Sequence, residues 1–164
     1  MSGLEQVRQA IINTLCAAGL TAIPAFAGQA AQYDTAVVTV DVGTVSGKPA
    51  AMGSYLGETY DPEAGTVREL YGCRLDLTLT LGAWAPRAAD CEIACETAAE
   101  TLLTGGLPSG LRLGEQRWEG VCWDKSNKLF LRKGQVEAKG FFIAVVDEES
   151  ASLIDFTLKG VLME

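Results

Sequence analysis

One stretch of the chain alternates between apolar and polar residues and is followed directly by a helical pattern. Its apolar residues occupy every second position, and they are Cys73, Leu75, Leu77, Leu79 and Leu81. A period of two residues is typical of a strand with one buried face and one exposed face. Residues 82–86 interrupt the alternation, and residues 87–103 then read as a helix rich in small residues. A strand that leads into such a helix predicts a sheet covered on one face by helices.

The remaining patterns place two main helices at about residues 3–18 and 86–104. The inner stripe of the second helix is Ala88, Cys91, Cys95, Ala98 and Leu102. Strands are expected at residues 36–42, 50–60, 67–81, 116–123, 135–146 and 152–162. Turn residues indicate hairpin tips or turns at residues 43–49, 61–66 and 124–128, and the last two strands are expected to form a closing hairpin. The predicted fold class is α+β: a single domain of residues 1–164, with a mostly antiparallel sheet and long hairpins packed by the two helices.

Length and charge narrow the class of protein. The 164 residues are enough for one domain with a real core, and the formal net charge is -8. Free nucleic-acid binding requires a basic face, so the acidic balance argues against it. No stretch of about 18 apolar residues predicts a membrane span. An amino-terminal signal peptide is not expected, because Glu5 accompanies Arg8 in front of an apolar stretch that polar residues interrupt.

The sequence offers little catalytic chemistry. It contains no histidine, which removes the commonest general base and the commonest metal ligand. Cys91 and Cys95 stand one helical turn apart, but a zinc site requires four ligands and the other cysteines are single and distant. No phosphate-binding glycine pattern occurs. We therefore expect no catalytic residue, no metal and no cofactor, and we interpret the five cysteines as free thiols, with Cys91 and Cys95 in the core.

Three groups of residues are candidates for an interface with other subunits. An acidic row at four-residue spacing on the outer face of the second helix is made of Glu92, Glu96 and Glu100. A basic cluster on this acidic chain is made of Lys125, Lys128, Arg132 and Lys133. Two large aromatic residues of the kind that interfaces favour are Trp118 and Trp123. Each group also has a structural interpretation, as a solvated helix face, a solvated hairpin end or core anchors.

The order of elements resembles that of the tail-terminator, or tail-completion, proteins of long-tailed phages and phage-derived particles. The resemblance rests on four stretches, which are the helix at residues 4–11, the strand at 74–81, the helix at 87–103 and the final strand at 154–164. It implies a structural subunit without catalytic residues that forms a ring, commonly a hexamer, at the head-proximal end of the tail tube. The implied partners are further copies of the chain, the tail tube protein, and a neck, head–tail connector or sheath protein.

The resemblance predicts that the protein ends tube polymerisation and presents a surface to the neck. The expected location is a virion or phage-tail-like particle, with a contractile or flexible tail, assembled in the cytoplasm of a bacterial host. Two alternatives stay open. One is a head–tail joining protein or tube subunit of the same particle. The other is a small α+β ligand-binding domain or enzyme that works without histidine, and self-assembly of the purified chain would separate it from the structural class.

Overall fold

The computed structural model describes residues 3–25, 31–63, 65–107 and 110–147. These residues form two helices and a seven-stranded, mostly antiparallel sheet, which confirms the α+β class. The helices are α1 (Gly3–Ala17) and α2 (Ala88–Thr104), close to their predicted bounds. The strands are β1 (Ala22–Pro24), β2 (Val37–Pro49), β3 (Tyr55–Asp61), β4 (Thr66–Ala85), β5 (Arg112–Trp118), β6 (Cys122–Asp124) and β7 (Leu129–Asp147). The strand predicted at residues 152–162 lies outside the described residues.

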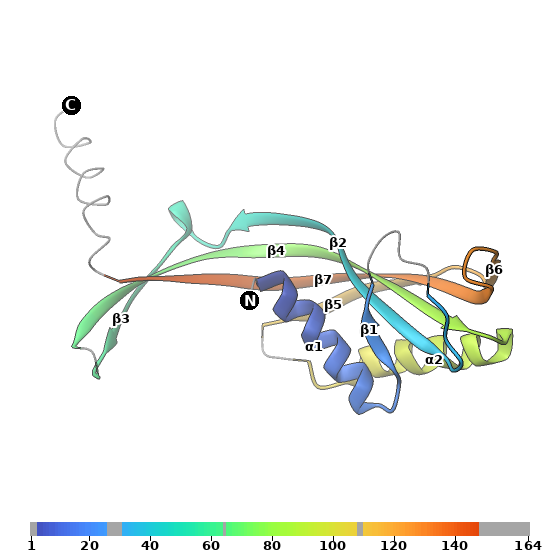
Figure 1. Ribbon diagram of the computed structural model, residues 1–164. Helices are drawn as coiled ribbons and strands as arrows, with labels where there is room; N and C mark the ends of the chain where they lie inside the picture. The colour runs from blue at the N-terminus through green and yellow to red at the C-terminus, as the bar shows by residue number, and fades with distance from the viewer. Residues whose placement is uncertain (1–2, 26–30, 64, 108–109, 148–164) are drawn as a thin grey trace. The chain divides into compact units, whose positions relative to one another are not determined.

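The strands follow the order β1-β2-β4-β7-β5, with β3 also paired to β4 and β6 also paired to β7 (Figure 1). β1 runs parallel to β2, whereas β3, β5 and β6 pair antiparallel to their partners. The sequence does not predict β1, because three residues are too few to show a period. The chain divides into two compact units, one of residues 1–46 and 76–140 and the other of residues 47–75 and 141–164.

The first unit holds the hydrophobic core. Its buried residues from β4 continue the predicted alternation, and they are Leu77, Leu79, Leu81, Ala83 and Ala85. The other elements contribute Ile11 and Leu15 from α1, Val38 and Val40 from β2, Cys91, Cys95, Ala98 and Leu102 from α2, and Val136 and Ala138 from β7. α1 contacts β1 and α2, and α2 contacts β5. The buried stripe of α2 is therefore the one that its small residues predict.

β4 is longer than the sequence predicts, because Gly82 does not end it. The alternation suggested a break after Leu81, whereas the strand continues to Ala85. A Cβ atom on residue 82 would lie 2.7 Å from Oγ1 of Thr39 and 2.8 Å from Nε1 of Trp84. The indole N–H donates to the Thr39 hydroxyl over 3.1 Å, and that hydroxyl donates to the Gly82 carbonyl over 3.2 Å. Glycine is required here for a close approach of side chains and not for a turn.

The hairpin tip predicted at residues 43–49 is wrong, because these residues continue β2 to Pro49. Gly43 fits closely against β4, where a Cβ atom would lie 3.1 Å from the carbonyl oxygen of Thr78. Pro49 stands at the end of the strand, where its missing N–H is tolerated. The chain reverses later, in a 3₁₀ turn over Met52–Ser54 that contains Gly53 at a φ of 62°.

The two other predicted turns are confirmed. Between β3 and β4, the N–H of Gly65 donates to the Asp61 carbonyl over 2.8 Å, and Gly65 has a φ of 66°. Between β6 and β7, the Asn127 side chain donates to the carboxylate of Asp124 over 2.6 Å. The strands around the second turn differ from the prediction. Instead of one strand at residues 116–123, β5 and β6 pair in succession with a β7 that begins at Leu129.

Candidate interaction surface

The second unit buries no side chain among its described residues. Within residues 47–63, 65–75 and 141–146, Gly72 alone is buried, and the side chains that the structure describes there are half-buried or exposed. The large apolar residues exposed in this unit are Met52, Tyr55, Leu56, Tyr60, Phe141, Phe142, Ile143 and Val145. A small sheet with no core of its own gains stability in water when another surface covers it, and contiguous exposed apolar residues mark interaction sites. This unit is the strongest candidate for an interaction surface.

The last part of β7 is apolar on both faces. Residues 141–146 read Phe-Phe-Ile-Ala-Val-Val, whereas apolar and polar residues alternate earlier in the strand. Phe141, Ile143 and Val145 share one face and are 60%, 55% and 54% exposed. Phe142 belongs to the other face and is 45% exposed. A strand with two apolar faces is typical of a sheet that is covered on both sides.

β3 and β4 form an antiparallel pair in which two tyrosines pack edge to face. Tyr55 lies opposite Tyr71, and their ring centroids are 5.6 Å apart. Tyr55 donates its hydroxyl to Glu58 over 3.2 Å, and Tyr71 donates to Glu69 over 3.0 Å. Partial desolvation and then the adjacent carboxylates raise the pKa of both tyrosines. Glu58 and Glu69 lie opposite each other, so the tyrosine hydroxyls help to offset the repulsion between like charges.

The acidic row lies on the exposed side of α2. Glu92, Glu96 and Glu100 are all exposed. Two aliphatic side chains of the same helix, Ile93 and Leu103, are also exposed, at 61% and 74%. Sequence reasoning missed these two residues, although both lie outside the buried stripe of small residues. Exposed aliphatic groups beside the acids strengthen the interface interpretation of this helix face, which stays a prediction.

The four basic residues do not form one surface. Lys125 and Lys128 are exposed in the turn between β6 and β7. Arg132 is half-buried, and its Nε donates to the carbonyl oxygen of Glu119 over 2.8 Å. Lys133 is exposed and follows Arg132 in the strand, so the two side chains project to opposite faces of β7. Lys125 and Lys128 therefore remain together as the candidate basic patch, whereas Arg132 is held by the hairpin itself.

The two candidate tryptophans differ in their surroundings. Trp118 is half-buried against Gly134, its partner in the β5–β7 pair, and its indole N–H points to Oε1 of Gln116 over 3.4 Å. Trp123 is 49% exposed and packs edge to face on Phe130, with 4.9 Å between ring centroids. Trp123 thus keeps free surface for a partner, and Trp118 is engaged within its own hairpin.

Two of the five cysteines, Cys91 and Cys95, lie in the core as the sequence predicts. Cys91 and Cys95 are 0% and 3% exposed, and all five cysteines are free. The Cys91 thiol donates to the carbonyl oxygen of Ala83 over 3.1 Å. Burial raises the pKa of both thiols above its ordinary value. Among the described residues, no group of three or more cysteine and acidic side chains is placed to hold a metal ion.

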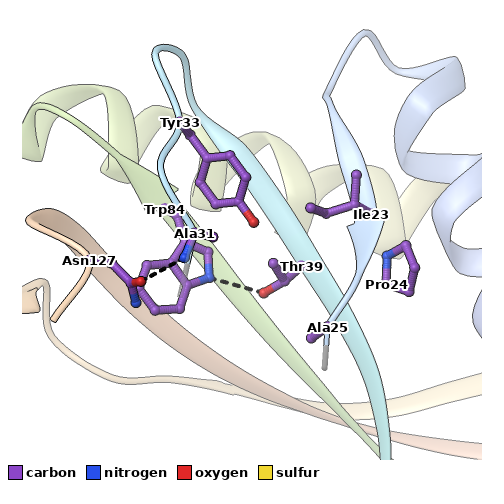
Figure 2. Close-up of a pocket in the computed structure, with 8 residues that line it drawn as sticks. All are labelled: Ile23, Pro24, Ala25, Ala31, Tyr33, Thr39, Trp84 and Asn127. Atoms are coloured by element: carbon purple, nitrogen blue, oxygen red, sulfur yellow. Dashed lines mark hydrogen bonds between the residues drawn. The ribbon is translucent and has the colours of Figure 1, made fainter. Parts of the chain in front are cut away.

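A cavity of about 130 Å³ lies in the first unit, beside the half-buried Thr39–Trp84 contact (Figure 2). Its lining residues are Ile23, Pro24, Ala25, Ala31, Tyr33, Thr39, Trp84 and Asn127. The polar groups of Thr39, Trp84 and Asn127 already have hydrogen-bond partners. Thr39 and Trp84 bond to each other, and the side-chain oxygen of Asn127 accepts from the N–H of Ala31 over 2.8 Å. The cavity contains no carboxylate, thiol or cationic group, so its lining supplies no acid, base or nucleophile at neutral pH other than hydroxyl groups.

Comparisons with known proteins found similarity to chains of solved structures. No protein-family model matches the chain, and no curated protein matches it. A chain of a solved structure described as "Virion of native gene transfer agent (GTA) particle" is similar with a TM-score of 0.35 and 12% sequence identity. The similarity covers 90% of this chain and 99% of that chain. In the part of the chain that the structure describes, neither helix has the length and apolar character needed to cross a membrane.

Proposed function

We propose that this chain is a structural subunit of a phage-like tail particle. The observation that carries the proposal is the second unit, whose described residues expose apolar side chains and form no core. Covering a side chain that is half exposed, such as Phe141 or Ile143, gains roughly 1 kcal/mol. Several such residues on one small sheet make association with another surface favourable, whereas a catalytic or ligand-binding domain has no need of them.

The more specific assignment is a tail terminator, which forms a ring at the head-proximal end of the tail tube and ends tube polymerisation. The order of helices and strands supports this assignment through the resemblance described above. In a cyclic ring each subunit meets its neighbours through two different surfaces. The second unit supplies one candidate surface, and the exposed side of α2, with its acidic row and Ile93 and Leu103, supplies another.

The proposed partners follow from this position in the particle. They are further copies of the chain in a ring, proposed to be a hexamer, together with the tail tube protein and a neck, connector or sheath protein. The alternative assignment is a head–tail joining protein or a tube subunit of the same particle. Imaging of assembled particles with this chain labelled distinguishes them, because a terminator is expected at the head-proximal end of the tube and a tube subunit along its length.

Self-assembly is tested with two variants of β7 that introduce the same residue. Ile143→Lys places a charge on the apolar segment, and Gln135→Lys places it at an exposed position of the same strand in the first unit. Light scattering after size-exclusion chromatography measures the mass of each assembly over a range of concentrations. We expect the wild type and Gln135→Lys to form the same oligomer and Ile143→Lys to shift to the monomer. A wild-type protein that stays monomeric at all concentrations would contradict the proposal.

A further inference from the structure

The cavity beside Trp84 is lined by segments that are far apart in the sequence and meet only in the folded chain. β1 contributes Ile23 and Pro24, the segment before β2 contributes Tyr33, and β2 and the end of β4 contribute Thr39 and Trp84. The whole lining belongs to the first unit and to the described residues. Figure 2 shows the two aromatic side chains on one side of the cavity and Ile23 and Pro24 on the other. The space between them therefore has largely apolar walls.

The hydroxyl of Tyr33 is the polar group of this lining that remains available. The side chains of Thr39, Trp84 and Asn127 already bond within the chain. For the Tyr33 hydroxyl, no hydrogen bond occurs among the described residues. A water molecule needs several polar partners to be held in a cavity, and this lining offers it little besides one hydroxyl. A ligand that displaces poorly held water with an apolar group gains affinity.

The volume of the cavity limits what it can hold. It measures about 130 Å³. An engineered apolar cavity of about 150 Å³ in another protein binds benzene, whereas pockets for larger ligands commonly measure about 300–1,000 Å³. The space near Trp84 is therefore suited to one ring and is too small for a nucleotide or a comparable cofactor.

We propose that this cavity binds one neutral aromatic ring that carries a hydroxyl group, which is the chemistry of a phenol. Tyr33 and Trp84 favour an aromatic ligand, because aromatic rings attract each other in offset and edge-to-face arrangements. The Tyr33 hydroxyl can donate to or accept from the hydroxyl of the ligand. The lining holds no charged side chain, so an ionised ligand would lose its hydration without compensation. The site binds without catalysing a reaction, and its existence does not depend on the proposed tail function.

Fluorine NMR of para-fluorophenol with the full chain tests the site. We expect line broadening that saturates as the protein concentration rises. Ala31→Leu adds a larger side chain to the lining and is expected to weaken binding at least tenfold. The matched control is Ala89→Leu, which makes the same change at an exposed position of α2 outside the lining and should bind as the wild type does. Absence of saturable binding to the wild type would overturn the proposal, and equal binding by the two variants would overturn its location.

The role of the Tyr33 hydroxyl is tested with Tyr33→Phe, which keeps the aromatic ring and so preserves the packing of the cavity. Loss of one neutral hydrogen bond should weaken para-fluorophenol about fivefold. Fluorobenzene has no hydroxyl, so its binding should be the same in Tyr33→Phe and the wild type. Equal affinity of both proteins for para-fluorophenol would overturn the selection of a hydroxylated ring.

A free phenol and the side chain of a tyrosine in another polypeptide share this chemistry, and competition separates the two sources. We expect para-cresol, which is the tyrosine side chain alone, to displace para-fluorophenol from the wild-type protein. Displacement by N-acetyltyrosinamide as well would support a ring that a polypeptide presents. Displacement by para-cresol alone would support a free phenol, because the cavity then excludes the peptide groups attached to the ring. Failure of para-cresol to compete would overturn the proposed ligand class.

Discussion

The indole ring of Trp118 lies over Gly134, directly across the β5–β7 pair, in the space that a side chain at residue 134 would need. A Cβ atom there would come within 2.8 Å of Cδ2 of the ring. An aromatic residue that covers a cross-strand glycine supplies the packing that glycine lacks. The pair therefore fixes the position of Trp118 and the register of the hairpin that carries the candidate basic residues.

Gly134→Ala is expected to destabilise the protein by about 1–3 kcal/mol, because the rigid indole has to move away from the new methyl group. The matched control is Gly120→Ala in the same hairpin, where a Cβ atom would meet nothing within 4 Å. Urea unfolding followed by tryptophan fluorescence and circular dichroism measures both. In the double variant Trp118→Ala, Gly134→Ala the two changes should be strongly non-additive, and simple additivity would contradict the contact.

Thr39→Val is expected to destabilise the first unit by about 1–2 kcal/mol. The substitution keeps the shape of the side chain but removes the acceptor of the Trp84 indole N–H and the donor to the Gly82 carbonyl. Thr80→Val on β4 is the control, because no hydrogen bond of its hydroxyl occurs among the described residues. Equal stability of the two variants in thermal unfolding would show that the Thr39 bonds contribute nothing.

The buried thiols predict a pH dependence of stability. Burial raises the pKa of Cys91 and Cys95 in the folded chain above their unfolded value. The unfolded state therefore loses protons first as the pH rises through about 8.5, the ordinary cysteine pKa. The stability contributed by these neutral thiols is fully present below that pH and is lost above it. We expect the free energy of unfolding to fall between about pH 8 and 10, and to fall less in a Cys91→Ala, Cys95→Ala variant.

The same double variant tests whether the thiols have any role beyond packing. It should lose stability through two small cavities and assemble as the wild type does. In the native wild-type chain a thiol reagent should modify the exposed Cys16 and Cys122 quickly and reach Cys91 and Cys95 only after unfolding. Rapid native modification of Cys91 would contradict the structural role.

The fold could be predicted from the sequence where a residue pattern has only one structural interpretation. Leu77, Leu79 and Leu81 alternate with polar residues, and Cys91, Cys95 and Ala98 recur at helical spacing, so the buried faces of β4 and α2 follow from period alone. Gly43 and Gly82 were misread as turn residues. Glycine also permits the close approach of a neighbouring strand. Gly43 lies against Thr78 and Gly82 lies against Thr39, and both neighbours are far away in the sequence, so a local pattern does not reveal them.

The candidate site was harder to predict for the same reason. The row Glu92, Glu96 and Glu100 is visible in the sequence, but the exposure of Ile93 and Leu103 depends on which side of α2 meets the sheet. The apolar run at residues 141–146 is also visible, yet it reads as a buried strand until its neighbours are known. Sequence patterns identify which residues need burial, and the structure shows which of them remain uncovered within one chain.

The last prediction concerns the acidic row of α2 and the basic patch of Lys125 and Lys128, which are both exposed in the first unit. Glu92→Lys with Glu96→Lys reverses the acidic row, whose expected counterpart on a neighbouring copy is the patch of Lys125 and Lys128. If the two surfaces meet in an assembly, the reversed chain should assemble poorly at low salt, and the difference from the wild type should shrink as salt screens the charges. Glu119→Lys with Glu137→Lys makes the same change in net charge at exposed positions outside α2 and is expected to leave assembly intact. Sedimentation over a salt series measures the oligomer. Assembly of the reversed chain at wild-type strength in low salt would show that these surfaces do not face each other.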